Sequence, residues 1–399
     1  MTMKIPESWF EVSLAEIIQI NPGVDKSMLA DTDEVVFVPM PAVEAETGKI
    51  DTSERRLFGK VKSGFTAFAS GDVLFAKITP CMENGKAAIA RDLLNGIGAG
   101  STEFYVLRAG NAVLPEFVFH FIRRPQFRQL CKANFTGSAG QQRVPKSFLE
   151  RVPIPLPPLE EQRRIVGLLD RAAEIRRRAG AARARARAVI PALFLDMFGD
   201  AAAGRRSWSV QPLKTVAQIG SGLTKGRKLR GETTLVPYLR VANVQDGHLD
   251  LSEVKTIEAT TSDIEKCSLQ AGDLLITEGG DADKLGRCAI WQDEVPGCLH
   301  QNHVFRVRVG RALLPEYAAS FIQSPAGKSY FLRVAKRTTG IASINKTQLG
   351  ALPVVVPPLE LQRTFVDLAR QVNGTLDKLD AAARKAEAMA AALSAEVFG

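Results

Sequence analysis

The chain has 399 residues, of which 45% are hydrophobic, enough to fill the cores of two or three domains. Its 52 Lys and Arg residues against 43 Asp and Glu residues give a net charge of +9, which favours a polyanionic partner over an acidic small molecule. The five cysteines are odd in number and lack a C-x-x-C pair, and no apolar run or signal-peptide core is long enough for a membrane or secretory segment. We therefore expect a cytoplasmic protein without a membrane partner.

The first part of the chain, residues 1–156, has the pattern of short strands and turns followed by helices. Runs rich in β-branched and aromatic residues are flanked by Gly, Pro and polar residues at 35–38, 73–78 and 104–107, which predicts strands. From 114 to 130 the apolar spacing becomes helical and is interrupted by Pro125. This part should form one mixed α and β domain.

Residues 157–200 predict one long helix. The segment Pro157-Pro158-Leu159-Glu160-Glu161-Gln162-Arg163 opens it, because proline is tolerated in the first turn, where the amide has no intrahelical partner. At 1.5 Å per residue, a run of about 34 residues makes a rod of roughly 50 Å. Pro191 should kink or end this helix. The apolar seam steps by threes and fours, typical of a helix that packs along another helix: Ile165, Leu168, Ala172, Ile175, Ala179, Ala182, Ala186, Val189 and Leu193.

The second half of the chain repeats the first. The opening segment returns 200 positions later as Pro357-Pro358-Leu359-Glu360-Leu361-Gln362-Arg363, with six of seven residues identical. Strands are predicted at 274–277 and 304–309, and helical spacing broken by Pro325 follows from 314 to 334. Residues 201–356 thus form a second mixed domain, and 357–399 a second long helix. Its seam has the same phase as the first: Phe365, Leu368, Val372, Leu379, Ala382, Ala386, Met389 and Leu393.

The duplication predicts the fold class. Two copies of one domain-plus-helix unit make the chain, and the simplest partner for each helical seam is the other seam. We expect an α+β fold in which two mixed α/β domains are separated by a long antiparallel two-helix coiled coil. An internal pseudo-two-fold repeat of about 200 residues relates the halves. Gly399 should then lie near Met1.

Motifs for catalysis are weak throughout. Gly327-Lys328-Ser329 resembles the end of a phosphate-binding loop, but Ile322 stands where the first glycine should be. Glu253-Val254-Lys255 has the composition of a nuclease triplet, which is common by chance. Both Pro-Pro pairs have apolar neighbours, so neither makes the Asn/Asp-Pro-Pro-aromatic corner of an adenine methyltransferase. We assign no catalytic residue.

A metal site is also weakly indicated. Cys298, His300 and His303 have a spacing that could hold zinc. No fourth ligand is in sight, and a strand is predicted to start at Val304, so a polar strand end is the better interpretation. We assign no metal ligand, and the polar run His300-Gln301-Asn302-His303 gains interest as a possible reader of base edges.

Polar and basic loops in matching places of the two halves indicate a nucleic-acid surface. Lys and Arg side chains meet phosphates, and nearby amides and imidazoles can discriminate bases; the alternative for any one of them is a solvated surface charge. In the first half the DNA-binding candidates are Lys77, Lys86, Ser101, Thr102, Gln141, Gln142, Arg143 and Lys146. In the second half they are Lys225, Arg227, Arg240, Asn243, Gln301, Asn302, His303, Asn345 and Lys346. The arginines at 176–178, 183, 185 and 187 could face DNA or carboxylates of a partner protein.

Several motifs together resemble the specificity subunits of type I restriction-modification systems. They are residues 72–86, 237–244 and 300–303 and the doubled Pro-Pro-Leu-Glu-x-Gln-Arg, and the resemblance covers the whole chain. It implies a non-catalytic subunit whose target-recognition domains, 1–156 and 201–356, each read one half of a bipartite double-stranded DNA site. The conserved spacer helices, 157–200 and 357–399, would fix the gap between the half-sites.

The resemblance also implies partners. Two methyltransferase subunits would bind S-adenosylmethionine and methylate adenine, and restriction subunits would use ATP and Mg; this chain itself would bind no cofactor. Residues of the spacer and partner interface would be Leu159, Gln162, Arg163, Ile165, Leu168, Ile175, Leu359, Gln362, Arg363, Phe365, Leu368 and Leu379.

Two alternatives belong to other function classes. The chain could be a nuclease or methyltransferase with an unrecognised active site, which cleavage or methyl transfer by the purified chain alone would favour. It could also be a coiled-coil adaptor whose domains bind only proteins. A gel shift with a split-site duplex against scrambled DNA separates the adaptor from the DNA reader.

Overall fold

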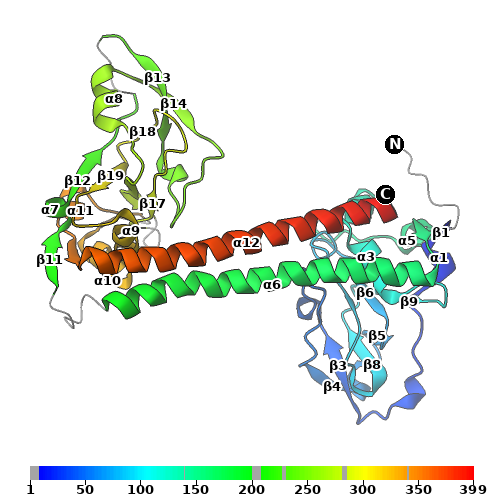
Figure 1. Cartoon of the computed structure of the whole chain (residues 1–399). Coiled ribbons are helices and arrows are strands. Elements are labelled where there is room, and N and C mark those ends of the chain that lie inside the picture. Colours follow the sequence, from blue (N-terminus) through cyan, green and yellow to red (C-terminus); the bar gives the residue numbers. More distant parts are fainter. Residues whose placement is uncertain (1–8, 139, 200–207, 227–230, 281–284, 339–340) are drawn as a thin grey trace. The chain divides into compact units, whose positions relative to one another are not determined.

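A computed structural model describes residues 9–138, 140–199, 208–226, 231–280, 285–338 and 341–399 of the chain (Figure 1). The chain divides into two compact units. Unit 1 consists of Met1–Ala179 with Asp380–Gly399, and unit 2 consists of Gly180–Leu379. In the described part of the chain, no helix is both long enough and apolar enough to cross a lipid bilayer.

Unit 1 contains two four-stranded sheets and one two-stranded sheet, with strand orders β2-β9-β6-β7, β4-β3-β8-β5 and β1-β10. The strands are β1 (Phe10–Ser13), β2 (Ile18–Ile20), β3 (Glu34–Val38), β4 (Arg55–Leu57), β5 (Thr66–Ala69), β6 (Val73–Ala76), β7 (Ala87–Ile89), β8 (Ile97–Gly100), β9 (Phe104–Ala109) and β10 (Pro153–Leu156). The α-helices before the long one are α1 (Leu14–Ile17), α2 (Phe58–Val61), α3 (Pro115–Arg123), α4 (Pro125–Ala133) and α5 (Lys146–Arg151). The strands and the broken helical stretch predicted for this half are confirmed.

Strand β6 lies at the centre of unit 1 because all four of its residues are buried. Successive side chains of a strand point to opposite faces. Val73 and Phe75 therefore join the core formed with α3 and α4, and Leu74 and Ala76 join the core shared with β3, β5 and β9. Because both faces of β6 are buried, its sequence is apolar at every position and does not alternate between apolar and polar residues.

Unit 2 has the same central four-stranded sheet as unit 1, but its other sheets differ. Its sheets have strand orders β12-β19-β15-β17, which matches β2-β9-β6-β7, and β14-β13-β18, β16-β21-β20 and β11-β22. The strands are β11 (Ser209–Pro212), β12 (Ala217–Ser221), β13 (Thr234–Leu239), β14 (Lys255–Ala259), β15 (Leu274–Thr277), β16 (Gly279–Gly280), β17 (Cys288–Ile290), β18 (Leu299–His300), β19 (Val304–Val309), β20 (Lys336–Thr338), β21 (Ile341–Ser343) and β22 (Pro353–Val356). The shorter α-helices are α7 (Leu213–Val216), α8 (Thr261–Cys267), α9 (Pro315–Gln323), α10 (Pro325–Val334) and α11 (Lys346–Gly350).

The two long helices are α6 (Leu159–Phe198) and α12 (Leu359–Phe398). In unit 1 the start of α6 packs beside the end of α12, since Ile165 and Val166 share one core with Val397 and Phe398. In unit 2 the end of α6 packs beside the start of α12 in the same way, with Phe194 and Phe198 against Phe365. The helices are therefore antiparallel. The predicted fold class is confirmed; the expectation about Met1 concerns a residue outside the described ones.

Pro191 does not end α6, because the helix runs on to Phe198. Of the two predicted effects of this proline, a kink or an end, the end is therefore wrong. The last two turns are held by aromatic side chains in the core of unit 2. Phe198 lies 4.8 Å from the ring of Tyr317, and Phe194 lies 5.5 Å from the ring of Phe365. Burial of such large rings stabilises the helix end by several kcal/mol, which offsets the roughly 3 kcal/mol cost of an interior proline.

The predicted helical seam is wrong at five positions, since Ala382 is exposed together with four larger side chains. Ile175, Val189, Leu368 and Met389 are 45%, 45%, 38% and 61% exposed. The helix starts instead bury a wider stripe that includes Val166, Leu169, Val366 and Ala369. The reason is that these turns pack against a domain as well as against the other helix, so the buried face is broader than a two-helix seam.

Candidate nucleic-acid interface

Three charged residues from separate segments of unit 1 meet beyond the end of β6. Lys77 follows β6, Glu103 precedes β9 and Arg143 belongs to the loop before α5; we call them the first loop cluster. Backbone hydrogen bonds join the segments, from Lys77 N to Glu103 O at 2.9 Å and from Val144 N to Lys77 O at 2.9 Å. The cluster is therefore positioned by the sheet itself.

Arg143 and Glu103 form a bidentate ion pair in this cluster. Arg143 Nε and Nη2 donate to the two carboxylate oxygens of Glu103 at 2.9 and 2.7 Å. These hydrogen bonds hold the pKa of Glu103 below its ordinary value and raise the pKa of Arg143. Lys77 Nζ lies 5.2 Å from the centre of the Tyr105 ring, and it makes no hydrogen bond or ion pair with another described residue. Lys77 is thus the cluster's available donor.

Four other predicted residues surround the first loop cluster. Thr102 and Gln141 are exposed, and Ser101 and Gln142 are half-buried. Ser101 Oγ accepts a hydrogen bond from Glu103 N at 3.2 Å, so this group shares one surface. The sequence analysis included these polar residues among the DNA-binding candidates but omitted Glu103. Its position in the repeat, equivalent to that of the candidate His303, could have identified it.

Unit 2 has an equivalent group, Glu278, Asn302 and His303, which we call the second loop cluster. Its backbone bonds match those of unit 1, since Glu278 N donates to His303 O at 3.0 Å and Ile344 N donates to Glu278 O at 2.8 Å. His303 Nδ1 lies 2.5 Å from Glu278 Oε2, and Asn302 Nδ2 lies 3.5 Å from His303 Nε2. Position 278 thus corresponds to Lys77 and position 303 to Glu103.

Both clusters are open to a ligand. The side chains of Arg143 and Glu103 are 39% and 25% exposed, and those of His303 and Glu278 are 56% and 31% exposed. Hydrogen-bonding groups held by strand ends and partly exposed are suited to recognising the edges of another molecule.

Other predicted residues lie on the surface in simpler settings. Lys225 is exposed in a turn and Lys346 is exposed at the start of α11. Lys146 Nζ lies 3.5 Å from Glu150 Oε1 on the surface of α5. Gln301 is half-buried, and its backbone N donates to Leu239 O at 2.9 Å. Arg227 lies outside the described residues.

Three of the predicted DNA-binding residues make side-chain hydrogen bonds within the fold. Asn243 is 3% exposed; its Oδ1 accepts from Arg240 N at 2.9 Å, and its Nδ2 donates to the carbonyls of Asp250 and Glu253. Lys86 Nζ donates to Met40 O at 2.8 Å. Asn345 Oδ1 accepts from Gln348 N as the N-cap of α11. These atoms therefore already have hydrogen-bond partners within the fold, and a DNA contact by these residues stays a prediction.

Arg240 and the carboxylate-lysine triplet form a surface ion-pair group. Arg240 Nη2 lies 2.8 Å from Glu253 Oε2, and Lys255 Nζ lies 3.4 Å from Glu253 Oε1. The hydrogen bond from Arg240 is the main cause that lowers the pKa of Glu253. This arrangement gives the triplet a structural explanation.

His300 cannot read a base edge because it is 0% exposed. Its Nδ1 lies 2.6 Å from Val304 O, and burial lowers its pKa to about 4, so the ring is neutral near pH 7. Cys298 is 2% exposed beside it. Within the described parts of the chain, no group of three or more His, Cys, Asp or Glu side chains could hold a metal ion.

The glutamines of the repeated motif join each long helix to its domain. Gln162 is 0% exposed; its Oε1 accepts from Leu114 N at 2.9 Å, and its Nε2 donates to Ala112 O at 2.9 Å and Pro157 O at 2.8 Å. Gln362 makes the same three bonds in unit 2. Both were predicted at the spacer and partner interface. They serve the spacer, but their burial leaves no surface for a partner.

The other predicted interface residues differ in exposure. Ile165 and Phe365 are 0% exposed and belong to the domain cores. Leu159, Leu359, Leu168 and Leu379 are half-buried, and Arg163 and Arg363 are exposed. Ile175 and Leu368 are exposed, as described above. The exposed residues of the predicted interface therefore lie on the surfaces of the long helices that no domain covers; we call these surfaces the free faces.

Two aspartates at equivalent places in the two units are buried. Asp72 and Asp273 are each 1% exposed. Each accepts two hydrogen bonds from an arginine of the neighbouring strand, Arg108 at 2.7 and 2.8 Å and Arg308 at 2.7 and 2.7 Å. These bonds raise the pKa of both arginines. The pairs tie the turn before β6 or β15 to the strand that leads from each loop cluster.

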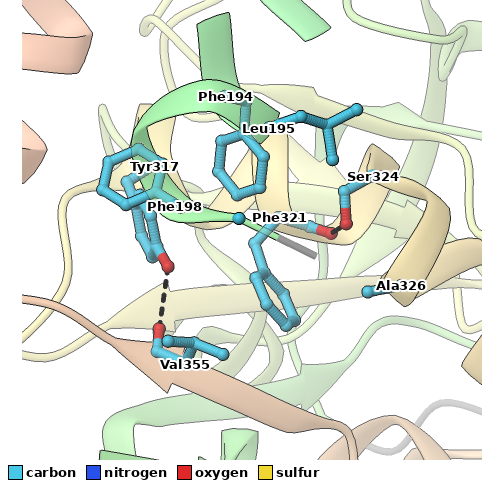
Figure 2. A pocket seen from close by; sticks show the side chains of 9 residues that line it. Phe194, Leu195, Phe198, Tyr317, Phe321, Ser324, Ala326 and Val355 are labelled. Carbon is cyan, nitrogen blue, oxygen red and sulfur yellow. Dashed lines mark hydrogen bonds between the residues drawn. The ribbon is translucent and has the colours of Figure 1, made fainter. Parts of the chain in front are cut away.

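Figure 2 shows the aromatic side chains around the end of α6 in unit 2, with Tyr317 donating to Val355 O at 2.9 Å. The cavity between Phe194, Phe198 and Phe321 has a volume of only about 10 Å³, roughly the space of one water molecule. It is a small packing gap in the aromatic core of unit 2.

The sequence model described as "Type I restriction modification DNA specificity domain" matches residues 6–176 and 205–385. The specificity subunit of the Escherichia coli type I restriction enzyme EcoEI is 43% identical over 165 residues, 41% of this chain but 27% of that protein. The EcoKI specificity subunit of Escherichia coli K12 is 25% identical over 402 residues, covering 94% of this chain and 84% of that protein.

Among solved structures, one chain from a study of complex assembly and conformational transition of the type I R-M system has a TM-score of 0.61 at 24% identity, with 99% of each chain covered. The S subunit of a type I restriction-modification system from M. genitalium has a TM-score of 0.59 at 14% identity, with 100% of this chain and 98% of that chain covered. These likenesses concern the fold. Because the sequence model matches both repeats, this chain belongs to the type I restriction-modification DNA specificity family.

Proposed function

We propose that the chain is the non-catalytic subunit that reads a bipartite, asymmetric double-stranded DNA site and holds methyltransferase and restriction subunits on it. The observation that carries this proposal is the pair of loop clusters. The same backbone hydrogen bonds present Lys77, Glu103 and Arg143 in one unit and Glu278 and His303 in the other. One scaffold with different polar side chains is what two readers of different sequences require.

Charge supports the choice of DNA as the ligand. The chain carries a net charge of +9, and exposed lysines such as Lys225 and Lys346 lie on loops or helix starts. Such side chains bind phosphates without regard to sequence and make affinity fall with salt. The loop clusters would then supply the sequence dependence.

The free faces of the long helices support a partner-binding role. Ile175 and Met389 in unit 1, and Val189 and Leu368 in unit 2, are apolar and between 38% and 61% exposed. Apolar side chains that are exposed on these helices are available to pack against a partner protein. We propose methyltransferase subunits as their partners; S-adenosylmethionine, ATP and Mg would be bound by the methyltransferase and restriction subunits, in the cytoplasm.

The proposal is tested by DNA binding of the chain with its methyltransferase partner. Methylated adenines in the host genome define the split site, and gel shifts then compare that duplex with one whose half-sites are scrambled, at about 0.15 M salt. The split duplex should bind at least tenfold more tightly. Equal binding of both duplexes would refute sequence reading.

The role of the two domains and helices is tested in the same assay. Exchange of residues 1–156 for those of another specificity subunit should change one half-site and leave the other unchanged. Insertion of one heptad into both α6 and α12 should lengthen the gap between unchanged half-sites. An unchanged gap with altered half-sites would contradict the spacer role.

A further inference from the structure

We propose that position 77 in unit 1 and position 278 in unit 2 are matched specificity-determining positions with opposite hydrogen-bonding character. Lys77 would select guanine, and Glu278 would select an exocyclic amino group, that of cytosine or adenine. His303 would act on Glu278 as a positioning residue. This inference rests on the proposed function and names which chemical group each half-site must offer at one base pair.

The two positions are equivalent in the backbone. The amide of residue 77 or 278 donates to the residue before β9 or β19, at 2.9 and 3.0 Å. Its carbonyl accepts from Val144 N in unit 1 and from Ile344 N in unit 2, at 2.9 and 2.8 Å. Both ends of the peptide are fixed in the same way, so the two side chains leave the scaffold at corresponding points.

The available groups at these points are opposite. In unit 1 both carboxylate oxygens of Glu103 are used by Arg143, and Arg143 Nη1 donates to Gln141 O at 2.8 Å. Lys77 Nζ remains as a donor. In unit 2, His303 Nδ1 contacts Glu278 Oε2, and Oε1 of Glu278 has no donor partner among the described residues. Glu278 therefore offers an acceptor.

Base edges in the major groove distinguish these groups. Guanine presents the acceptors N7 and O6, which suit a lysine ammonium, whereas cytosine N4 and adenine N6 are donors, which suit a carboxylate. A carboxylate facing guanine O6 would be left without a donor and would repel the acceptor. A matched contact is expected to favour the right base by a factor of roughly 5 to 150 in affinity.

The contact between His303 and Glu278 gives the carboxylate a fixed direction. A side chain that is 31% exposed and anchored at one oxygen loses less rotamer freedom on binding than a free glutamate. Replacement of His303 should therefore weaken discrimination at the same base pair and should not move it to another.

The experiment uses the full chain with its methyltransferase partner and a duplex library in which both half-sites are randomised around the natural gap. Bound duplexes are sequenced for the wild type, for Glu278→Gln, Glu278→Lys, Lys77→Glu and His303→Ala, and for the exposed control Glu265→Gln. Glu278→Gln keeps the shape of the side chain, so the test does not depend on whether the charge reversal folds.

The wild type and Glu265→Gln should select a split site with cytosine or adenine at one position of the second half-site. Glu278→Gln should relax that preference, Glu278→Lys should turn it to guanine on the contacted strand, and the first half-site should not change. Lys77→Glu should produce the reciprocal change in the first half-site alone, and His303→Ala should reduce selection at the position that Glu278 controls.

If the wild type selects a split site and Glu278→Gln selects it with unchanged preferences, the inference is overturned while the proposed function stands. Changes spread over both half-sites would overturn it as well, because they indicate a general loss of structure. A wild type that selects no split site would instead remove the proposed function.

Discussion

The clearest test of how the domains hold their helices is the substitution Gln362→Leu. Leucine has a similar volume and helix propensity, but it cannot make the hydrogen bonds of Gln362 to Leu314 N, Ala312 O and Pro357 O, each 2.9 Å long. The side chain is 0% exposed, so water cannot replace them. Each lost bond is worth about 1 kcal/mol, and an orphaned buried amide costs more, so unit 2 should lose about 3 to 5 kcal/mol.

Urea unfolding measures this change. The buried Trp291, 0% exposed, gives a fluorescence signal from unit 2, and circular dichroism reports helix content. The neighbouring Arg363→Ala is the matched control, because Arg363 is exposed and its replacement should change the free energy of unfolding by less than about 0.5 kcal/mol. A loss below about 1 kcal/mol for Gln362→Leu, comparable to the control, would refute the reasoning.

Two further predictions concern pH and the end of α12. Burial lowers the pKa of His300 to about 4, below the value of about 6.5 in the unfolded chain. As the pH falls from 6.5 to 4, the unfolded chain therefore binds a proton at this residue and the folded chain does not. The free energy of unfolding should fall over this range by at most about 3 kcal/mol. Unfolding of wild type and His300→Gln across this range should show a shallower slope for the variant; equal slopes would contradict it. The ring of Phe398 lies 5.0 Å from that of Phe117, and Phe398→Ala should lower the free energy of unfolding by about 3 to 5 kcal/mol. Met389→Ala, at an exposed position of the same helix, should leave the melting temperature nearly unchanged.

Much of the architecture could be predicted because it depends on local signals. The Pro-Pro pair before Leu159 marks a helix start by its missing amides, and α6 begins at that residue. The repeat at an offset of 200 made the second domain and helix follow from the first. The run rich in β-branched and aromatic residues at 73–78 predicted a strand, and β6 occupies Val73–Ala76.

The candidate interface was harder to predict because polarity does not reveal direction. Asn243 and His303 are both polar residues in loops beside strands, yet Asn243 is 3% exposed and the side chain of His303 is 56% exposed. The difference comes from the carbonyls of Asp250 and Glu253, which lie close to Asn243 only in the folded chain. Main-chain acceptors are the same for every residue type, so the sequence does not reveal that these two carbonyls meet Asn243.

The helical seam failed for a related reason. A heptad pattern predicts which side chains lie on one stripe of a helix. It does not predict how much of the helix surface a neighbouring domain covers. Val166 and Leu169 are buried by the domain core of unit 1, while Ile175 remains exposed.

The buried glutamine at the start of each long helix has a consequence for how the protein can evolve. Gln162 binds only main-chain atoms, those of Ala112, Leu114 and Pro157, and every amino acid except proline supplies the same peptide groups. The side chains of the adjoining loop can therefore mutate without loosening the joint, so natural selection is free to redesign what a domain recognises while the mechanical connection is inherited intact.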